Sequence, residues 1–427
     1  MNDRSGKLIV AVVASALLIT TLFFRQTSSQ NNDSAAEGKQ PGKPTVAALA
    51  DDSTLGQMAV DTFVSLNGPA SSTMRGQPDP NNKLGASVPA VWETFKNSSE
   101  LYRPQGAVPP DWNTLCEIPV AFPPMTTTQL QQQFGPTNST WVHYLSESRM
   151  IDGQQVVDAN GTVIRYDVRC NQDHFNYVAS NPSGYQLFNI EGQEQALNDA
   201  NFTFLFPTRC LEVKAAWRVL NKGDDDTRYW TAYGAYYDAG GNPTYAKIGL
   251  TAFHFISHLN PSWTWFTYEH ADNATATYKL FLQEKGEAVG PNKTVNPLAD
   301  QFNATLQTQT QGTKWQFYQI IGWQGDETDA NGKPIILANS NIETYFPATS
   351  SCMSCHAMAN IGGTNDQRLN FWISDRKGIR GRVGDINFNA IAAKLAPGQK
   401  FKQMNYVWSL RQAQSTQAPD VKPAAKP

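Results

Sequence analysis

The stretch YWTAYGAYYDAGGNPTYAKIGLTAFHFISHL, residues Tyr229–Leu259, decides the fold class. It contains two segments rich in β-branched and aromatic residues, Tyr229–Tyr237 and Tyr245–Leu259, and this composition is typical of β-strands. Asp238–Pro243 lies between them and is a turn by its composition. We therefore predict two adjacent strands at the centre of the chain.

The same pattern continues on both sides of this stretch. Leu211–Leu220 and Gln316–Trp323 have strand composition, and Gln154–Val157 and Thr162–Val168 form a predicted hairpin around an Asn-Gly turn. Helical signals are few and short. We predict a β-rich domain over residues 90–345, either sandwich-like or of irregular β structure.

The C-terminal part of the chain has a helical residue pattern instead. Asn387–Leu395 alternates at helical spacing and ends before Pro397, and Asn405–Gln412 has the pattern of a final amphipathic helix. This predicts a small α-helical domain over residues 346–411. Residues 412–427 are polar and form a predicted disordered tail.

The N-terminus carries an export signal. Arg4 and Lys7 precede the uncharged apolar run Leu8–Phe24, which is about long enough to span a bilayer. No small-residue cleavage site follows the run, which favours a signal anchor over a cleaved signal peptide for residues 1–25. Residues 26–55 are a predicted flexible tether. The expected location is the periplasm, with the N-terminal helix anchored in the inner membrane.

Composition excludes several classes of protein. The 427 residues include 34 Lys and Arg against 37 Asp and Glu, so the formal net charge is −3. This balance excludes binding of nucleic acid through bulk positive charge. Hydrophobic residues make up 40% of the chain, which is enough for large cores and excludes wholesale disorder.

The most specific motif is Cys352-Met353-Ser354-Cys355-His356. C-x-x-C-H is the attachment pattern of c-type haem. Two thiols three residues apart on a helical turn can reach two vinyl groups of one porphyrin edge, and the adjacent histidine can bind the iron. A zinc site would need further ligands, yet no cysteine or histidine follows His356. A redox dithiol of the thioredoxin type would need a βαβ context, which is missing here.

The chain also resembles a family at this point. The haem motif, flanked by Ser350-Ser351 and Ala357-Met358-Ala359, is similar to that of bacterial c-type cytochromes, in particular large exported proteins with one haem motif near the C-terminus. The other resembling stretches are Glu212–Arg218, Gly249–His258, Trp265–Asn273 and Tyr406–Leu410. The resemblance implies one covalent haem c, electron transfer and a cytochrome c-like domain over residues 346–411. It implies no substrate.

His356 is the expected proximal ligand, and the distal ligand is left open. Met404 lies downstream, as the distal methionine of small cytochromes does, but it directly precedes the predicted final helix. The alternatives are histidines of the β region: His254, His258 and His270. His254 and His258 share a strand face but would be about 13 Å apart, so they cannot both bind one iron. We expect His258 or His270 rather than Met404.

Two function classes remain. The first is an electron carrier with a six-coordinate haem that exchanges single electrons with a redox protein partner. The second is a haem-dependent periplasmic oxidoreductase, with an open distal site or a second metal site built from His254, His258, Glu269 and His270. The carrier is preferred, because no catalytic constellation is visible.

Three further cysteines lie outside the motif. Since disulfides are stable in an oxidising compartment, we predict a Cys170–Cys210 bond, which leaves Cys116 as a free thiol.

Overall fold

A computed structural model gives the fold of residues 51–417. It describes this range except residues 146, 149, 152–153, 159–160, 259–262, 276–295, 297, 327–328, 330–334, 344–349, 358, 363–397 and 399. The predicted signal anchor, most of the tether, the predicted helix Asn387–Leu395 and residues 418–427 of the tail lie outside the described residues. Within the described residues, no helix is long and apolar enough to cross a bilayer.

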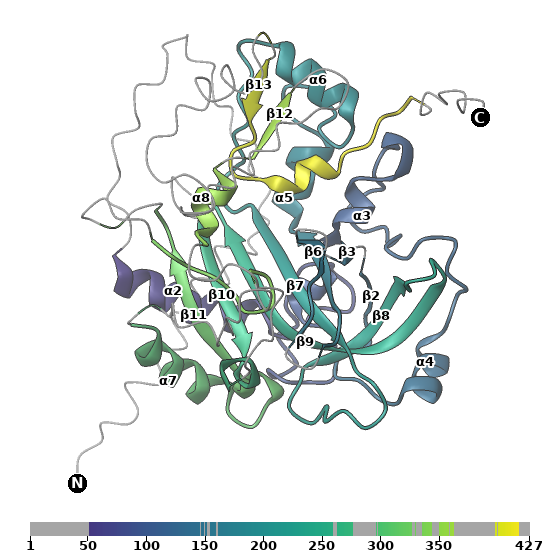
Figure 1. Cartoon of the computed structure of the whole chain (residues 1–427), viewed down its shortest axis with the longest axis vertical. Helices are drawn as coiled ribbons and strands as arrows, with labels where there is room; N and C mark the ends of the chain where they lie inside the picture. The colour runs from purple at the N-terminus through teal and green to yellow at the C-terminus, as the bar shows by residue number, and fades with distance from the viewer. Residues whose placement is uncertain are drawn as a thin grey trace.

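One nine-stranded sheet organises the described chain (Figure 1). Its main path has the order β1-β6-β7-β9-β10-β11, with β3 beside β6, β8 beside β9 and β2 beside β8. All pairs are antiparallel except β2 with β8. The bounds are β1 (Lys96–Asn97), β2 (Val142–Tyr144), β3 (Glu147–Ser148), β6 (Ile164–Cys170), β7 (Leu211–Val219), β8 (Thr231–Tyr237), β9 (Pro243–Ser257), β10 (Thr264–His270) and β11 (Tyr318–Gln324). Two small ribbons pair β4 (Met150–Ile151) with β5 (Gln154–Gln155), and β12 (Asn360–Gly362) with β13 (Phe401–Gln403).

The central hairpin forms where the sequence predicts it. β8 and β9 pair up to Tyr237 and Pro243. The Asp238 carboxylate accepts hydrogen bonds from the backbone N–H groups of Gly240 and Asn242, which closes the turn. Side-chain acceptors of this kind are the reason that Asp initiates turns. The long strand β9 then runs between β7 and β10.

Two of the longer helices pack on the β11 end of the sheet. α2 (Asp52–Leu66) and α7 (Ala299–Thr310) pack together against β11. The other helices are α3 (Ser98–Leu101), α4 (Thr127–Phe134), α5 (Gln172–Ala179), α6 (Ile190–Asn198) and α8 (Cys352–His356), and the 3₁₀ turns are η1 (Val91–Thr94), η2 (Pro104–Gly106), η3 (Ala271–Thr275), η5 (Lys314–Phe317) and η7 (Trp408–Gln412).

The start of α2 corrects the predicted tether. Asp51 caps this helix by accepting a hydrogen bond from the Thr54 N–H at 2.7 Å. Phe63 of α2 is fully buried against Phe253 and Tyr268. Residues 52–55 therefore belong to a core helix, and the predicted tether over 26–55 extends too far.

The hydrophobic core joins the sheet to the C-terminal segment. Met353, Met404 and Leu410 are buried in the same cluster as Phe253 and Trp265. The described part of residues 346–411 thus packs directly on the β region.

The predicted helix Asn405–Gln412 is wrong in its first half. Asn405 and Tyr406 have φ angles of 48° and 67°, which interrupt a right-handed helix. Only the short turn η7 (Trp408–Gln412) follows them.

The predicted disulfide is also wrong in this structure, because Cys170 and Cys210 are buried free thiols. Cys170 is directly opposite Glu212 in the β6–β7 register. Cys210 is therefore a diagonal neighbour, about 7–8 Å away, beyond the usual Cα separation of a disulfide.

Candidate functional site

The C-x-x-C-H motif forms a short helix that is attached to the sheet. α8 (Cys352–His356) carries both thiols and the histidine. Gln324, the last residue of β11, donates to the Ser351 hydroxyl at 2.9 Å and accepts from the Met353 N–H at 3.2 Å. These two bonds hold the start of α8 at one end of β11.

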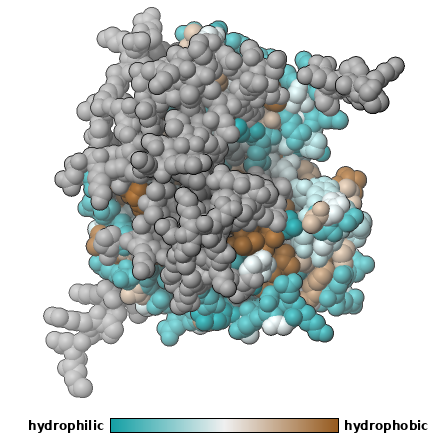
Figure 2. Space-filling view, viewed as in Figure 1, coloured by the Kyte–Doolittle hydropathy of each residue, from teal (hydrophilic) through white to brown (hydrophobic). Residues whose placement is uncertain are grey.

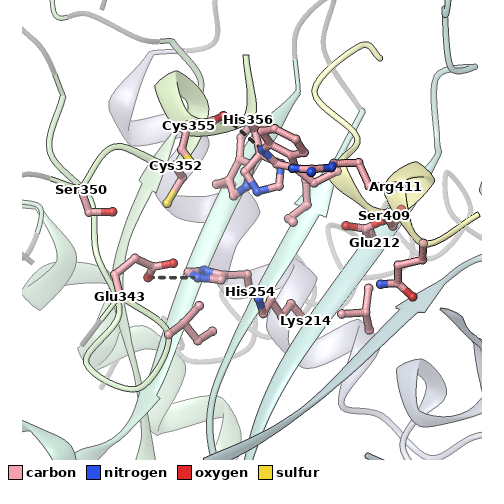
Figure 3. Close-up of a pocket in the computed structure, with 16 residues that line it drawn as sticks. Glu212, Lys214, His254, Glu343, Ser350, Cys352, Cys355, His356, Ser409 and Arg411 are labelled. Carbon is pink, nitrogen blue, oxygen red and sulfur yellow. Dashed lines mark hydrogen bonds and ion pairs between the residues drawn. The ribbon is translucent and has the colours of Figure 1, made fainter. Parts of the chain in front are cut away.

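A cavity lies between α8, the sheet and η7 (Figure 3). Its volume is about 370 Å³, within the range of about 300–1,000 Å³ typical of ligand pockets. Its walls combine apolar side chains with a few charged ones. The lining residues are Val168, Glu212, Lys214, His254, Ile256, Trp265, Ile342, Glu343, Ser350, Cys352, Cys355, His356, Trp408, Ser409, Arg411 and Gln412.

His356 has one ring nitrogen engaged by the protein. Its Nδ1 lies 2.7 Å from the Tyr406 carbonyl oxygen, which can only accept, so Nδ1 carries the proton and donates. This leaves Nε2 as the nitrogen with a lone pair. Burial lowers the pKa of His356 to about 4, which keeps the ring neutral at pH 7, the form that binds metals. Trp265 packs edge-on against the ring, with centroids 5.0 Å apart.

The opposite wall of the cavity is one face of the sheet. Lys214 on β7 is directly opposite His254 on β9, and Ile256 on β9 is directly opposite Trp265 on β10. Side chains two residues apart on a strand share a face, so these residues form a continuous surface. In the view of Figure 3, His254 lies below His356 and the two cysteines.

Of the predicted distal ligands, only His254 lines the cavity with His356. His258 stacks on Trp263, with centroids 4.9 Å apart, and its Nδ1 donates to the Pro207 carbonyl at 3.0 Å. The placement of His258 therefore does not support the expectation that it is the distal ligand.

His270 is directed elsewhere as well. It stacks on Tyr229 with centroids 4.1 Å apart, and its Nε2 lies 3.4 Å from the Arg228 carbonyl. Burial lowers its pKa to about 4. Met404 is fully buried between β13 and η7 and does not line the cavity.

The second metal site predicted in the β region is not assembled. Glu269 and His270 are successive residues of β10, so their side chains leave opposite faces of the sheet. Both carboxylate oxygens of Glu269 accept hydrogen bonds from Ser340, at 2.5 and 2.9 Å, and burial raises the pKa of Glu269 to about 7.

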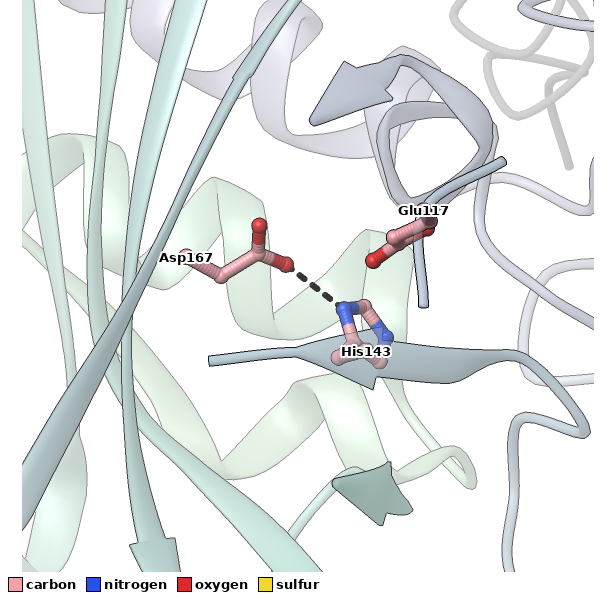
Figure 4. A group of neighbouring side chains, drawn as sticks. All are labelled: Glu117, His143 and Asp167. Carbon is pink, nitrogen blue, oxygen red and sulfur yellow. Dashed lines mark hydrogen bonds and ion pairs between the residues drawn. The ribbon is translucent and has the colours of Figure 1, made fainter. Parts of the chain in front are cut away.

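A different buried cluster brings potential metal ligands together: Glu117, His143 and Asp167 (Figure 4). Among the described residues it is the one group of three or more such side chains whose ligand atoms lie within 4.8 Å of one another. Arg169 pairs with both Glu117 and Asp167, and its guanidinium lies 3.0 Å from His143 Nδ1. His143 bridges Asp167 at 2.6 Å and Glu93 at 2.9 Å. A guanidinium already supplies the positive charge, so this cluster is an ion network.

The charges in this network shift one another's protonation. Burial opposes ionisation of Asp167, but the neighbouring Arg169 outweighs it and lowers the pKa of the carboxyl. Burial and Arg169 also oppose protonation of His143, yet the hydrogen bonds to Asp167 and Glu93 prevail and raise the pKa of its ring.

Sequence reasoning missed several cavity residues. Lys214 and Trp265 fall within the stretches that carry the family resemblance, but nothing local indicated that they face His356. Arg411 and Glu343 carried no motif at all.

The described surface in Figure 2 shows hydrophobic residues in small separate groups among hydrophilic ones.

Comparison with protein-family models, with curated proteins and with solved structures finds no match for this chain.

Proposed function

We propose that this chain is an exported c-type cytochrome that binds one haem c through Cys352 and Cys355, with His356 as an axial ligand. The observation that carries the proposal is the geometry of α8. Both cysteines and His356 line one cavity, and the hydrogen bond from His356 Nδ1 to Tyr406 leaves Nε2 available for iron.

The residues around the motif fit this cofactor. Ile256, Trp265 and Trp408 supply apolar surface for a porphyrin face. Lys214 and Arg411 line the same cavity and supply positive charge for its carboxylates. Haem attached here would supply one-electron chemistry, and the chain would bury it against the sheet.

A zinc site is less compatible with the same residues. The ligand atoms of a closed zinc site lie within a few ångströms of one another. Among the described residues, Cys352, Cys355 and His356 do not form such a group. Two cysteines that line one cavity and a histidine held separately by Tyr406 suit a porphyrin edge and an iron.

Electron transfer is the preferred role. A haem bound in this cavity would be held by residues of the sheet and of α8, and it would supply one-electron chemistry there. The expected partner is another redox protein.

The test is covalent attachment. The protein is expressed with a haem-maturation system, and haem is stained on a denaturing gel. Cys352→Ala combined with Cys355→Ala should abolish the stain, while Cys116→Ala, a partly buried free thiol outside the cavity, should retain it. Unchanged staining of the double variant would refute haem c.

Location is tested by fractionation of the same cells. We expect the full-length chain in the membrane fraction, released by detergent, because the apolar run Leu8–Phe24 has no cleavage site after it. A soluble periplasmic form that starts near Ser28 would show that the segment is a cleaved signal.

A further inference from the structure

We infer that His254, in the middle of the sheet, is the second axial ligand of the iron, so that the β region supplies one face of the cofactor site. This inference rests on the proposed function, and it names the residue that determines how the site works.

The first support is the tautomer of His254. Its Nδ1 lies 2.9 Å from the Thr267 hydroxyl oxygen, directly across from it in the β9–β10 register. The Thr267 hydroxyl can donate or accept; with iron on Nε2, Nδ1 would carry the proton and donate to Thr267. The lone pair then resides on Nε2, as it does in His356, where Nδ1 donates to Tyr406. A hydrogen bond at one ring nitrogen is what orients a metal-binding histidine.

The second support is an unsatisfied buried atom. His254 is only 4% exposed, and its Nε2 makes no hydrogen bond in the structure. Its Nε2 lies 3.4 Å from Oε2 of Glu343, which is an ion pair when the ring is protonated but is outside hydrogen-bond geometry. A buried polar atom left without a hydrogen bond destabilises the folded chain, because it has lost its contact with water. Such an atom on the wall of a cavity that already holds two haem-type thiols is explained by a ligand in that cavity.

The third support is the placement of the competing side chains. His258 and His270 are stacked on aromatic rings and hydrogen-bonded to backbone carbonyls outside the cavity. Met404 does not line the cavity. His254 is the histidine on the sheet side of the cavity, and its imidazole can donate a nitrogen lone pair to iron.

Rigid support on both sides has a functional consequence. His254 lies on β9, which is paired on both sides, with Lys214 on β7 and Thr267 on β10 as its direct neighbours. A ligand fixed by the sheet does not need to move when the iron gains or loses one electron. Bis-histidine ligation also places the potential below that of histidine–methionine ligation.

The experiment compares the spectra of haem-loaded variants. Wild type should be six-coordinate and low-spin, without the near-infrared band of methionine–iron(III) ligation. His254→Ala should become high-spin, bind carbon monoxide and return to low-spin when imidazole is added. The matched control is His258→Ala, four residues along on the same side of the chain, which should keep the wild-type spectrum.

A second variant covers the case in which alanine prevents folding. His254→Met keeps a buried side chain that can bind iron, and it should show the near-infrared methionine band and a raised potential. Glu343→Gln should stay low-spin, since Glu343 is a neighbour and not a ligand.

Two outcomes overturn the inference. One is a wild-type protein that is already high-spin; the other is a His254→Ala protein that remains low-spin. In both, a positive haem stain shows that the proposed cofactor is present and that only the ligand assignment fails. An absent stain in wild type refutes the proposed function itself.

Discussion

The Nδ1 atom of His356 lies 2.7 Å from the carbonyl oxygen of Tyr406, a residue 50 positions further along the chain. Tyr406 and the preceding Asn405 both have positive φ angles, of 67° and 48°. Non-glycine residues in this region are uncommon and often mark functional constraints. Here the unusual backbone presents a carbonyl to the histidine of the C-x-x-C-H motif.

The first prediction concerns the residue that holds this turn. The Asn405 side-chain oxygen accepts from the Phe206 N–H and from the Trp263 indole N–H, both at 3.2 Å. Asn405→Ala leaves both donors unpaired and should lower the free energy of unfolding by about 1–3 kcal/mol. It should also raise the reduction potential of the haem-loaded protein, because a looser Tyr406 carbonyl makes His356 less basic.

Thermal unfolding and redox titration measure these two effects. Asn405→Asp keeps the accepting oxygen and tolerates positive φ, so it should remain closer to wild type. If Asn405→Ala and Asn405→Asp change the unfolding free energy and the reduction potential equally, the Asn405 side-chain oxygen does not hold the turn.

The second prediction separates packing from ligation at Met404. This side chain is fully buried in the core. Met404→Leu preserves the volume and removes the thioether, so it should cost less than about 1.5 kcal/mol and leave the low-spin spectrum unchanged. Met404→Ala should cost about 2–5 kcal/mol without a change of spin state. Conversion of Met404→Leu to a high-spin form, seen by absorption spectroscopy, would identify Met404 as the ligand.

The third prediction concerns the buried ion network. Arg169→Met leaves the Asp167 and Glu117 carboxylates without their cation, and we expect a loss of about 3–5 kcal/mol in a denaturant titration. Arg209→Met breaks a pair with Asp173 in which both side chains are about a third or more exposed to solvent, so it should cost about 0–1 kcal/mol. Added zinc or calcium should not raise the melting temperature through this cluster. A metal-dependent rise that Asp167→Asn abolishes would argue for a metal site instead.

The fourth prediction concerns pH. His174 is fully buried, neither ring nitrogen has a hydrogen-bond partner, and burial lowers its pKa to about 3. Between pH 6.5 and about 3, the unfolded chain binds a proton at this residue that the folded chain does not. The contribution of neutral His174 to the free energy of unfolding is therefore fully present above pH 6.5. It falls by about 1.4 kcal/mol per pH unit as the pH decreases toward 3.

His174→Leu removes this contribution. Its unfolding free energy, measured from pH 7 down to pH 4, should decrease less steeply than that of wild type. Parallel pH profiles for the two proteins would show that His174 is protonated equally in both states.

The sequence by itself determined the local features. The strands β7, β8 and β9 lie close to where their β-branched and aromatic composition predicts them, because strand propensity and turn chemistry act over a few neighbouring residues. The spacing within Cys352–His356 is likewise a local property, since a helical turn places the two thiols and the imidazole whatever surrounds them.

Only the tertiary structure decided which distant residues meet that motif. His254, His258 and His270 are equivalent by residue type, yet strand register and the face of each side chain bring His254 alone of the three to the cavity. The predicted Cys170–Cys210 disulfide is wrong for the same reason, because a register offset of two residues separates the two cysteines. The positive φ angles at Asn405 and Tyr406 ended a helix that periodicity favoured, and contacts with Phe206 and Trp263 maintain them. These contacts join residues far apart in the chain, and no local pattern encodes them.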